Sequence, residues 1–340
     1  MKILATFKPE WYELPDHSYG VVAEIDWSNK TILRQLRLPS ASFRDDTAFQ
    51  APLLGGLTQI GNRLFVALWN CIVEIDYATF QVVNAVSHPW MADLHGMTTD
   101  GKRLWVVSSA VEAVLCFDAE SLTPLWRWGP DQAILEHGAP AWRGWWPLRL
   151  FDPRRKAVER EYRYIHKSRS PYRRHHMNDI RFHQGLLYIT THRWFDSKAG
   201  AIIRLDPESR EAHFHVPPGS FQGMHDGEFR DGRLYVTESA ANSVAWREAD
   251  GRPEHRSLQP APYFVRGLCQ GENDSFLVGF TRLRRSEAPS WIIEYDATFT
   301  REISRLDVSC FYPAKQGTAV HALLRSPESP TLETTTCAAS

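Results

Sequence analysis

The chain has 340 residues, of which 43% are hydrophobic and 23% are charged, so it can bury the core of one large domain. Its formal net charge of −1 excludes a general electrostatic attraction to nucleic acid or to an anionic membrane surface. No stretch reaches the roughly 18 apolar residues that a membrane-spanning helix needs. We therefore expect a soluble globular protein with no nucleic-acid or membrane partner.

The N-terminal residues 1–16 hold a short apolar run followed by proline and glutamate, without the long apolar region of a signal peptide. The five cysteines are scattered through the chain with no CxxC spacing. We interpret them as small buried side chains in a reducing compartment, which makes a cytoplasmic location the expectation.

Three strands are predicted near the N-terminus: KILATFK from Lys2, GVVAEID from Gly20 and TILRQLRL from Thr31. They look like the second, third and fourth strands of a four-stranded unit whose first strand is missing. Complete copies of that unit follow downstream.

The repeated segments begin at Gly55, His95, Asn178, His225 and Arg266. Each contains a short strand, a turn at Gly, Asp or Asn, and then a strand of the type RLYVT. A variable loop and a third strand of the type IIRLD come next, usually with a fourth strand. Four short strands that recur every ~40 residues are typical of propeller blades, so the chain is predicted to be an all-β protein, a single β-propeller.

Residues 129–175 interrupt the repeats between the fourth strand of one blade and the first strand of the next. They contain GAPAWRGWWPL and ten Lys or Arg residues from Arg149 to Arg174. In a propeller this connection lies on the face where the first strands begin, so we expect the insertion to act as a lid over a ligand. A solvated decoration or an oligomer contact is the alternative.

The C-terminal DVSCFYPA, residues 307–314, is predicted to supply the missing first strand and to close the ring. Five complete blades and this composite blade make six. Seven blades stay an alternative, because residues 311–327 could add more strand. The propeller then spans residues 1–327, and residues 328–340 form a disordered tail rich in Ser, Thr and Pro.

The register of the repeat places polar residues near the axis. Counting back nine residues from the Leu of each RLY-type strand gives His95, Asn178 and His225, and Arg266 precedes the equivalent Gly267. First strands run side by side around the axis, so their opening residues converge across the central channel. This register therefore indicates a site.

The residue types at this register suit a divalent cation. His95 and His225 are the first candidate metal ligands, with Asn178 and Asp226, or His176, completing the set. Two imidazoles favour a transition metal such as Fe, Zn or Mn over Ca. The alternative is that these side chains hydrogen-bond the backbone of the neighbouring blade.

The candidate catalytic residues are Glu238, His176, Asp226 and His192, because a carboxylate or an imidazole can act as a general base. Glu238 and His192 belong to a second ring of polar residues, expected from the loops between second and third strands. A salt bridge to a neighbouring arginine is the alternative for Glu238.

The candidate substrate-binding residues are Arg266, Asn178 and Arg282. Guanidinium groups suit a carboxylate or a phosphate, and the basic insertion adds further positive charge. A small anionic metabolite is therefore the expected substrate class.

The segments HGMTTDGKRLWVVSS, HMNDIRFHQGLLYITTH and MHDGEFRDGRLYVTES resemble strands of the six-bladed propeller superfamily with NHL, strictosidine synthase, gluconolactonase and paraoxonase members. The resemblance covers most of the chain as a repeat and implies six blades. In the lactonase members a central calcium held by Asn, Asp and Glu polarises an ester carbonyl. Asn178 and Asp226 are similar to that pattern. His95 and His225 depart from it, which favours a transition metal or histidine acid–base chemistry.

Three functional hypotheses follow, and no Walker loop, GxGxxG, GxSxG or HExxH motif adds another. The first is a metal-dependent enzyme of hydrolase, lyase or isomerase type, acting on a small anionic metabolite. The second is a metal-free enzyme with a His/Asp acid–base pair. The third is a non-catalytic propeller that binds a protein or peptide.

Overall fold

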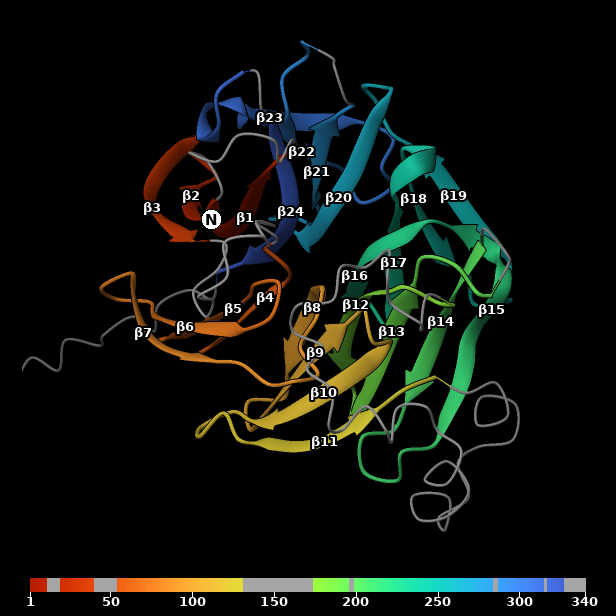
Figure 1. Cartoon of the computed structure of the whole chain (residues 1–340). Helices are drawn as coiled ribbons and strands as arrows, with labels where there is room; N and C mark the ends of the chain where they lie inside the picture. Colours follow the sequence, from red (N-terminus) through yellow and green to blue (C-terminus); the bar gives the residue numbers. More distant parts are fainter. Residues whose placement is uncertain are drawn as a thin grey trace, which may run out of the picture.

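Four-stranded antiparallel sheets follow one another around a common axis in a ring of six (Figure 1). The computed structural model describes residues 1–10, 19–39, 54–130, 174–195, 199–283, 287–314 and 317–326. Within these ranges the helices are short 3-10 turns at Ser239–Ala241 and Ser309–Phe311. The predicted six-bladed β-propeller is confirmed.

The blades are numbered here in the order in which their first strands occur. Blade 1 comprises β4 (Leu57–Ile60), β5 (Arg63–Ala67), β6 (Ile72–Asp76) and β7 (Gln81–Val86). Blade 2 comprises β8 (Leu94–Thr99), β9 (Arg103–Ser108), β10 (Ala113–Asp118) and β11 (Pro124–Trp128). Blade 3 comprises β12 (Met177–His183), β13 (Leu186–Thr191), β14 (Ala199–Leu205) and β15 (Ala212–Gln222).

The other three blades complete the ring. Blade 4 comprises β16 (Met224–Arg230), β17 (Arg233–Glu238), β18 (Ser243–Arg247) and β19 (Pro253–Ser257). Blade 5 comprises β20 (Tyr263–Gln270), β21 (Phe276–Arg282), β22 (Trp291–Tyr295) and β23 (Glu302–Asp307). Blade 6 comprises β24 (Thr318–Arg325), β1 (Lys2–Pro9), β2 (Tyr19–Asp26) and β3 (Thr31–Pro39).

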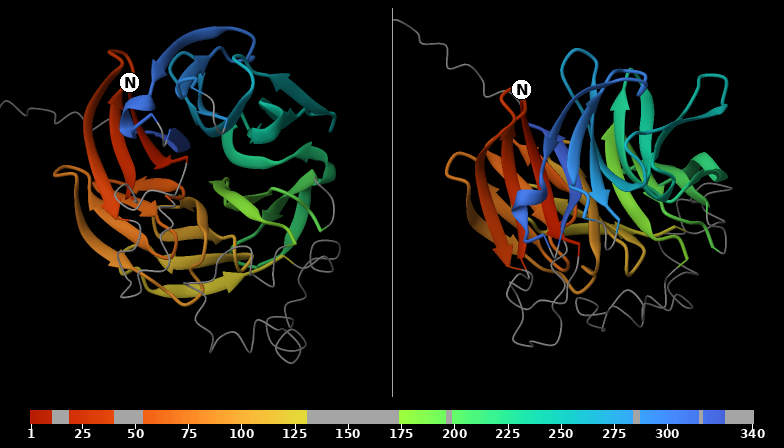
Figure 2. Two further views of the ribbon diagram at one scale, coloured as in Figure 1. Left: turned by 45° about the horizontal axis from the view of Figure 1, so that its top comes forward. Right: turned by 90° about the horizontal axis from the view of Figure 1, so that it is seen from above.

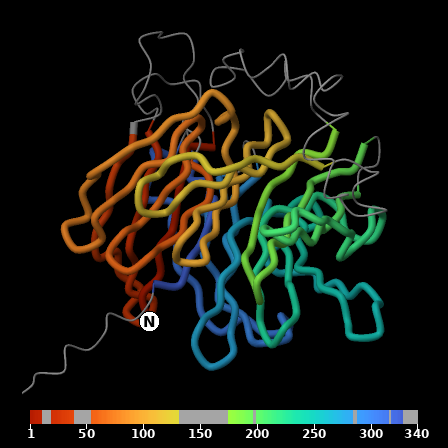
Figure 3. Tube along the Cα trace, turned by 90° about the horizontal axis from the view of Figure 1, so that it is seen from below, coloured from red at the N-terminus to blue at the C-terminus, as the bar shows by residue number. Residues whose placement is uncertain are grey.

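Blade 6 is composite, as predicted, but the closing strand is β24 and not residues 307–314. Figures 2 and 3 show the blue C-terminal strand against the red N-terminal strands. The segment that was expected to close the ring packs across its end instead. Phe311 stacks on Phe7 with ring centroids 4.0 Å apart, and the Tyr312 hydroxyl donates to the Phe7 carbonyl at 3.1 Å.

Apolar side chains fill the space between neighbouring blades. Trp105 of β9 and Phe182 of β12 stack with centroids 5.3 Å apart, within a cluster that joins blades 2 and 3. Burying one large aromatic side chain stabilises a fold by about 2–3 kcal/mol. Such clusters recur around the ring, so the innermost strands are held at fixed positions.

The connection from β11 to β12 carries the chain from Trp128 to Met177. The predicted lid falls on this connection, and its residues 131–173 lie outside the described residues, as does the predicted tail 328–340. No helix in the described ranges is long and apolar enough to cross a bilayer.

Candidate functional site

The innermost strands of blades 2 to 6 each carry a β-bulge. The pairing register shifts between Leu94 and Met97 of β8, between Met177 and Asp179 of β12, and between Met224 and Gly227 of β16. Bulges also lie in β20 and β24 at Gly267 and His321. A bulge re-aims the side chain that it carries, which is why polar residues at this register turn toward the axis.

The bulge register confirms the alignment of the sequence repeat. His95, Asn178 and His225 are each the second residue of an innermost strand, as the count from the RLY-type strands predicts. His321 occupies the same register in blade 6 and was missed. It was missed because residues 307–314 were assigned as the closing strand. The almost continuous apolar run in TAVHALLR, residues 318–325, was the available signal.

The imidazole rings of His321, His95, His176, His192 and His225 form a continuous series, called here the histidine arc. Successive ring centroids are 5.8, 5.4, 5.7 and 5.3 Å apart in that order. The rings come from blades 6, 2, 3 and 4. Blade 1 contributes Gly55 at the equivalent position, and this residue has no side chain to lie between His321 and His95.

Arg266 of β20 reaches one end of this arc. Its Nη2 donates to His95 Nδ1 at 2.9 Å, and its Nε lies 3.9 Å from Asp226 Oδ2. The other ring nitrogen of His95, Nε2, lies 3.3 Å from Asp93 Oδ1. An arginine can only donate, so His95 must accept at Nδ1 and carry its proton on Nε2. Burial is the main cause that lowers the pKa of His95 to about 4, so the ring is neutral at neutral pH.

His225 has the opposite arrangement of its ring nitrogens. Its Nδ1 lies 3.0 Å from the Gly223 carbonyl and 2.7 Å from Ser239 Oγ. A carbonyl only accepts, so the contact favours a proton on Nδ1 and leaves the lone pair on Nε2. Burial, followed by the charge of Arg266, lowers the pKa of His225 well below its usual value. His225 is thus a neutral imidazole with Nε2 available as a base.

His176 is positioned from blade 2. Glu112, in the loop between β9 and β10, accepts hydrogen bonds through Oε1 from the backbone N–H groups of Arg174, His175 and His176 at 2.5, 2.6 and 3.2 Å. The backbone of His176 has a left-handed φ of 51°. A single buried carboxylate therefore fixes the segment that presents this ring.

Asn178 and Asp226 bond the neighbouring blade, as the alternative interpretation of this register described. Asn178 Nδ2 donates to the Met224 carbonyl at 2.5 Å, which joins blades 3 and 4. Asp226 Oδ2 accepts from the Gly267 N–H at 2.8 Å, which joins blades 4 and 5. Burial, opposed by the nearby Arg266 charge, raises the pKa of Asp226.

Glu238 and Arg282 lie at strand ends, where the sequence places them, but local partners hold both. Glu238 Oε1 accepts from the Gln222 N–H at 2.7 Å, and Oε2 lies 2.8 Å from Ser243 Oγ and 2.7 Å from His255 Nδ1. Arg282 Nε pairs with Glu10 Oε2 at 3.1 Å. None of these contacts involves the histidine arc. The salt-bridge alternative for Glu238 describes its contact with His255, with histidine in place of the expected arginine.

The four predicted metal ligands do not converge as a ligand set. His95 uses Nδ1 for Arg266 and faces Asp93 with Nε2, while Asn178 and Asp226 bond backbone groups. In the described part of the chain, no group of three or more His, Cys, Asp or Glu side chains is arranged to hold a metal ion.

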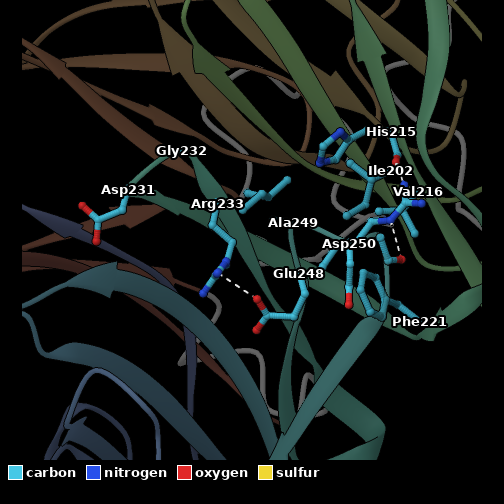
Figure 4. A pocket seen from close by; sticks show the side chains of 13 residues that line it. Ile202, His215, Val216, Phe221, Asp231, Gly232, Arg233, Glu248, Ala249 and Asp250 are labelled. Carbon is cyan, nitrogen blue, oxygen red and sulfur yellow. Dashed lines mark hydrogen bonds and ion pairs between the residues drawn. The ribbon is translucent and has the colours of Figure 1, made fainter.

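A second cavity lies away from the axis, between blades 3 and 4 (Figure 4). This groove of about 620 Å³ has Ile202, Val216 and Leu234 among its apolar lining. Among its charged groups, Arg233 Nη2 pairs with Glu248 Oε2 at 2.8 Å. The end of the ring that holds the histidine arc and Arg266 is called here the mouth of the ring. It is the stronger candidate for a functional site, because buried polar groups from several blades converge there.

Comparison with known proteins supports the fold. No protein-family model and no curated protein matches the chain. A protein of unknown function from Bacteroides caccae is 9% identical with a TM-score of 0.59, covering 95% of this chain and 97% of that one. A chain in a nidogen/laminin complex is 8% identical with a TM-score of 0.58, over 95% and 97% of the two chains. At this level of identity the likeness concerns the fold alone.

Proposed function

We propose that the protein is an enzyme that binds a small anionic metabolite at the mouth of the ring and moves a proton with a neutral histidine. The observation that carries this proposal is the buried hydrogen bond between Arg266 and His95, together with His225, whose Nε2 has no hydrogen bond to any of the described residues. The proposal needs no metal, in line with the second of the hypotheses drawn from the sequence.

Arg266 supplies the anion-binding group. Arg266 is 6% exposed. The Asp226 carboxylate lies 3.9 Å from its Nε and accepts a hydrogen bond from the backbone of β20. A guanidinium in a site with little water binds carboxylate or phosphate oxygens more strongly than one in bulk solvent. The charge of Lys8 also acts on His95, His321 and Asp226, which adds to the positive potential at the mouth.

His225 supplies the base. With its proton on Nδ1 bonded to Gly223, Nε2 can accept a proton from a substrate C–H or from a water. The electron pair left on the substrate moves toward an oxygen, where Arg266 stabilises the negative charge. Return of the proton to another atom gives an isomerase, departure of a leaving group gives a lyase, and attack by the activated water gives a hydrolase.

The test is a screen of the full chain against small carboxylates and phosphates, read by thermal stabilisation and by NMR for product. We expect binders that become substrates, and we expect Arg266→Met to weaken them by about tenfold or more. Arg266→Lys keeps the charge but loses the planar donor pair, so partial binding is expected. Equal binding by the native protein and Arg266→Met would contradict the proposal.

A further inference from the structure

A narrow pocket lies on the axis, bordered by Asn178 and Asp179 of β12, Asp226 of β16 and His321 of β24. Gly96 of β8 also lines it, and a Cβ there would lie only 2.5 Å from Asp179 Cα. The absence of a side chain lets the innermost strands approach closely and leaves a space about the size of a water molecule.

Two buried polar atoms of this pocket have no hydrogen-bond partner within the described ranges: Asn178 Oδ1 and His321 Nδ1. Both residues are 2% exposed. The amide orientation of Asn178 is fixed, because Nδ2 donates to the Met224 carbonyl and the flipped amide would place two oxygens together. Oδ1 is therefore an acceptor, and a buried acceptor without a donor is unfavourable.

The neighbouring carboxylates do not supply that donor. Asp179 Oδ2 accepts from the Gly227 N–H at 2.7 Å and pairs with Arg181 Nε at 3.0 Å. Asp226 Oδ2 accepts from Gly267 at 2.8 Å. Arg181 also lines the pocket, and its Nε is directed to Asp179 and to the Gly227 carbonyl. Asn178 Oδ1 is thus left without a donor, and a group that completes the pocket would bring one.

We propose that this pocket binds one hydroxyl or amino group of the substrate whose anionic end lies on Arg266. The inference rests on the proposed function and narrows it. Asp226 borders the pocket, and its carboxylate also lies 3.9 Å from Arg266 Nε. The side chain of Asp226 therefore lies between the pocket and the guanidinium of Arg266. The substrate class is then a short hydroxy acid or amino acid, with its donor a few atoms from its carboxylate.

The experiment compares glycolate, glycine and acetate, which share a carboxylate and differ in the donor. Their dissociation constants for the full chain are measured by NMR titration. We expect glycolate or glycine to bind about tenfold or more tightly than acetate, because the site then pairs its acceptor. Whichever of the two binds better identifies the group as hydroxyl or ammonium.

A matched pair of variants at His321 isolates the pocket. His321→Phe fills the volume without a polar atom and should bring the affinity ratio close to one while acetate binding is kept. His321→Asn places an amide where Nδ1 lies and should retain most of the ratio. Thermal unfolding checks that both variants fold.

The outcomes separate the pocket from the site above it. If the three probes bind with equal affinity and Arg266→Met weakens all of them, the pocket does not bind a hydroxyl or amino group. The proposed function is then unaffected. If Arg266→Met leaves the dissociation constants of the probes unchanged, the proposed function itself is contradicted. A metal ion or a permanent water between Asn178 Oδ1 and His321 Nδ1 in a crystal soaked with glycolate would also overturn the inference, as would failure of glycolate and glycine to bind at all.

Discussion

Arg266 Nη2 and His95 Nδ1 meet at 2.9 Å across 171 residues of sequence. Arg266 belongs to blade 5 and His95 to blade 2, which stand on opposite sides of the six-bladed ring. The hydrogen bond therefore links blades across the axis and fixes the Nη2 end of the guanidinium. His95 is a positioning residue for this arginine, since both of its ring nitrogens face protein partners.

Replacing His95 tests this positioning role. His95→Leu removes the acceptor, so we expect the arginine to lose its orientation and small carboxylates to bind about tenfold more weakly. His95→Asn keeps an acceptor near the position of Nδ1 and should retain most of the affinity. NMR titration with the same carboxylate measures both, and unchanged binding by His95→Leu would show that Arg266 does not depend on His95.

The buried arc predicts a specific pH dependence of stability. Burial first, and then the charge of Arg266, hold the pKa of His321 well below its usual value of 6.5. Below that value the unfolded chain binds a proton that the folded chain refuses, so this histidine destabilises the fold as the pH falls. His321→Phe lacks the effect.

The native protein should therefore lose stability relative to His321→Phe, by on the order of 2 kcal/mol, between about pH 7 and about pH 5. Urea unfolding of both proteins at the two pH values gives the difference. Comparing the two proteins cancels the opposite contribution of Asp179, whose pKa burial raises to about 7. A difference that does not change with pH would mean that His321 is not buried in its neutral form.

Gly96 should be intolerant of any side chain. Gly96→Ala puts a Cβ into the Asp179 carboxylate and backbone, so blades 2 and 3 must separate. We expect a loss of about 2–3 kcal/mol in the free energy of unfolding. Gly101→Asn is the control, because Gly101 lies in an open turn with φ of 90° and nothing near its Cβ position. A similar loss in both variants would point to a turn effect instead of blade packing.

Removal of metal should leave turnover unchanged. The basis is the commitment of His95, Asn178 and Asp226 to protein partners. Turnover of an identified substrate is measured before and after dialysis against a chelator, with thermal unfolding as the control for the fold. Activity that disappears and returns with Fe, Zn or Mn would instead support the metal-dependent enzyme that the residue types first suggested.

The repeat in the sequence was sufficient to predict the fold and much of the arc. His95, Asn178 and His225 share a register because blades 2, 3 and 4 each place a bulge at the same distance from the second strand. The alignment of the sequence repeats did not identify His321, because its blade is divided between the two termini. Repeat alignment needs a following RLY-type strand, and for β24 that strand is at the other end of the chain.

Sequence patterns could not predict the side-chain partners of Glu238 and Arg282. Both sit where strand ends reach the loops, yet Glu238 turns to Ser243 and His255, and Arg282 turns to Glu10. Strand position gives a residue's height along the axis but not the partner that its side chain selects. The Arg266–His95 bond was equally hidden, because it depends on the closure of the whole ring.

Exchange of substrate protons with the solvent tests whether His225 moves a proton. The native chain, His225→Asn and His215→Asn are incubated in D₂O with the substrate, and NMR follows deuterium entry and product. His225→Asn keeps an N–H toward the Gly223 carbonyl but has no atom at Nε2, while His215 lies in the groove between blades 3 and 4. We predict a rate about 100-fold or more below native for His225→Asn, with binding kept, and a native rate for His215→Asn. A native rate for His225→Asn would show that His225 is not the base.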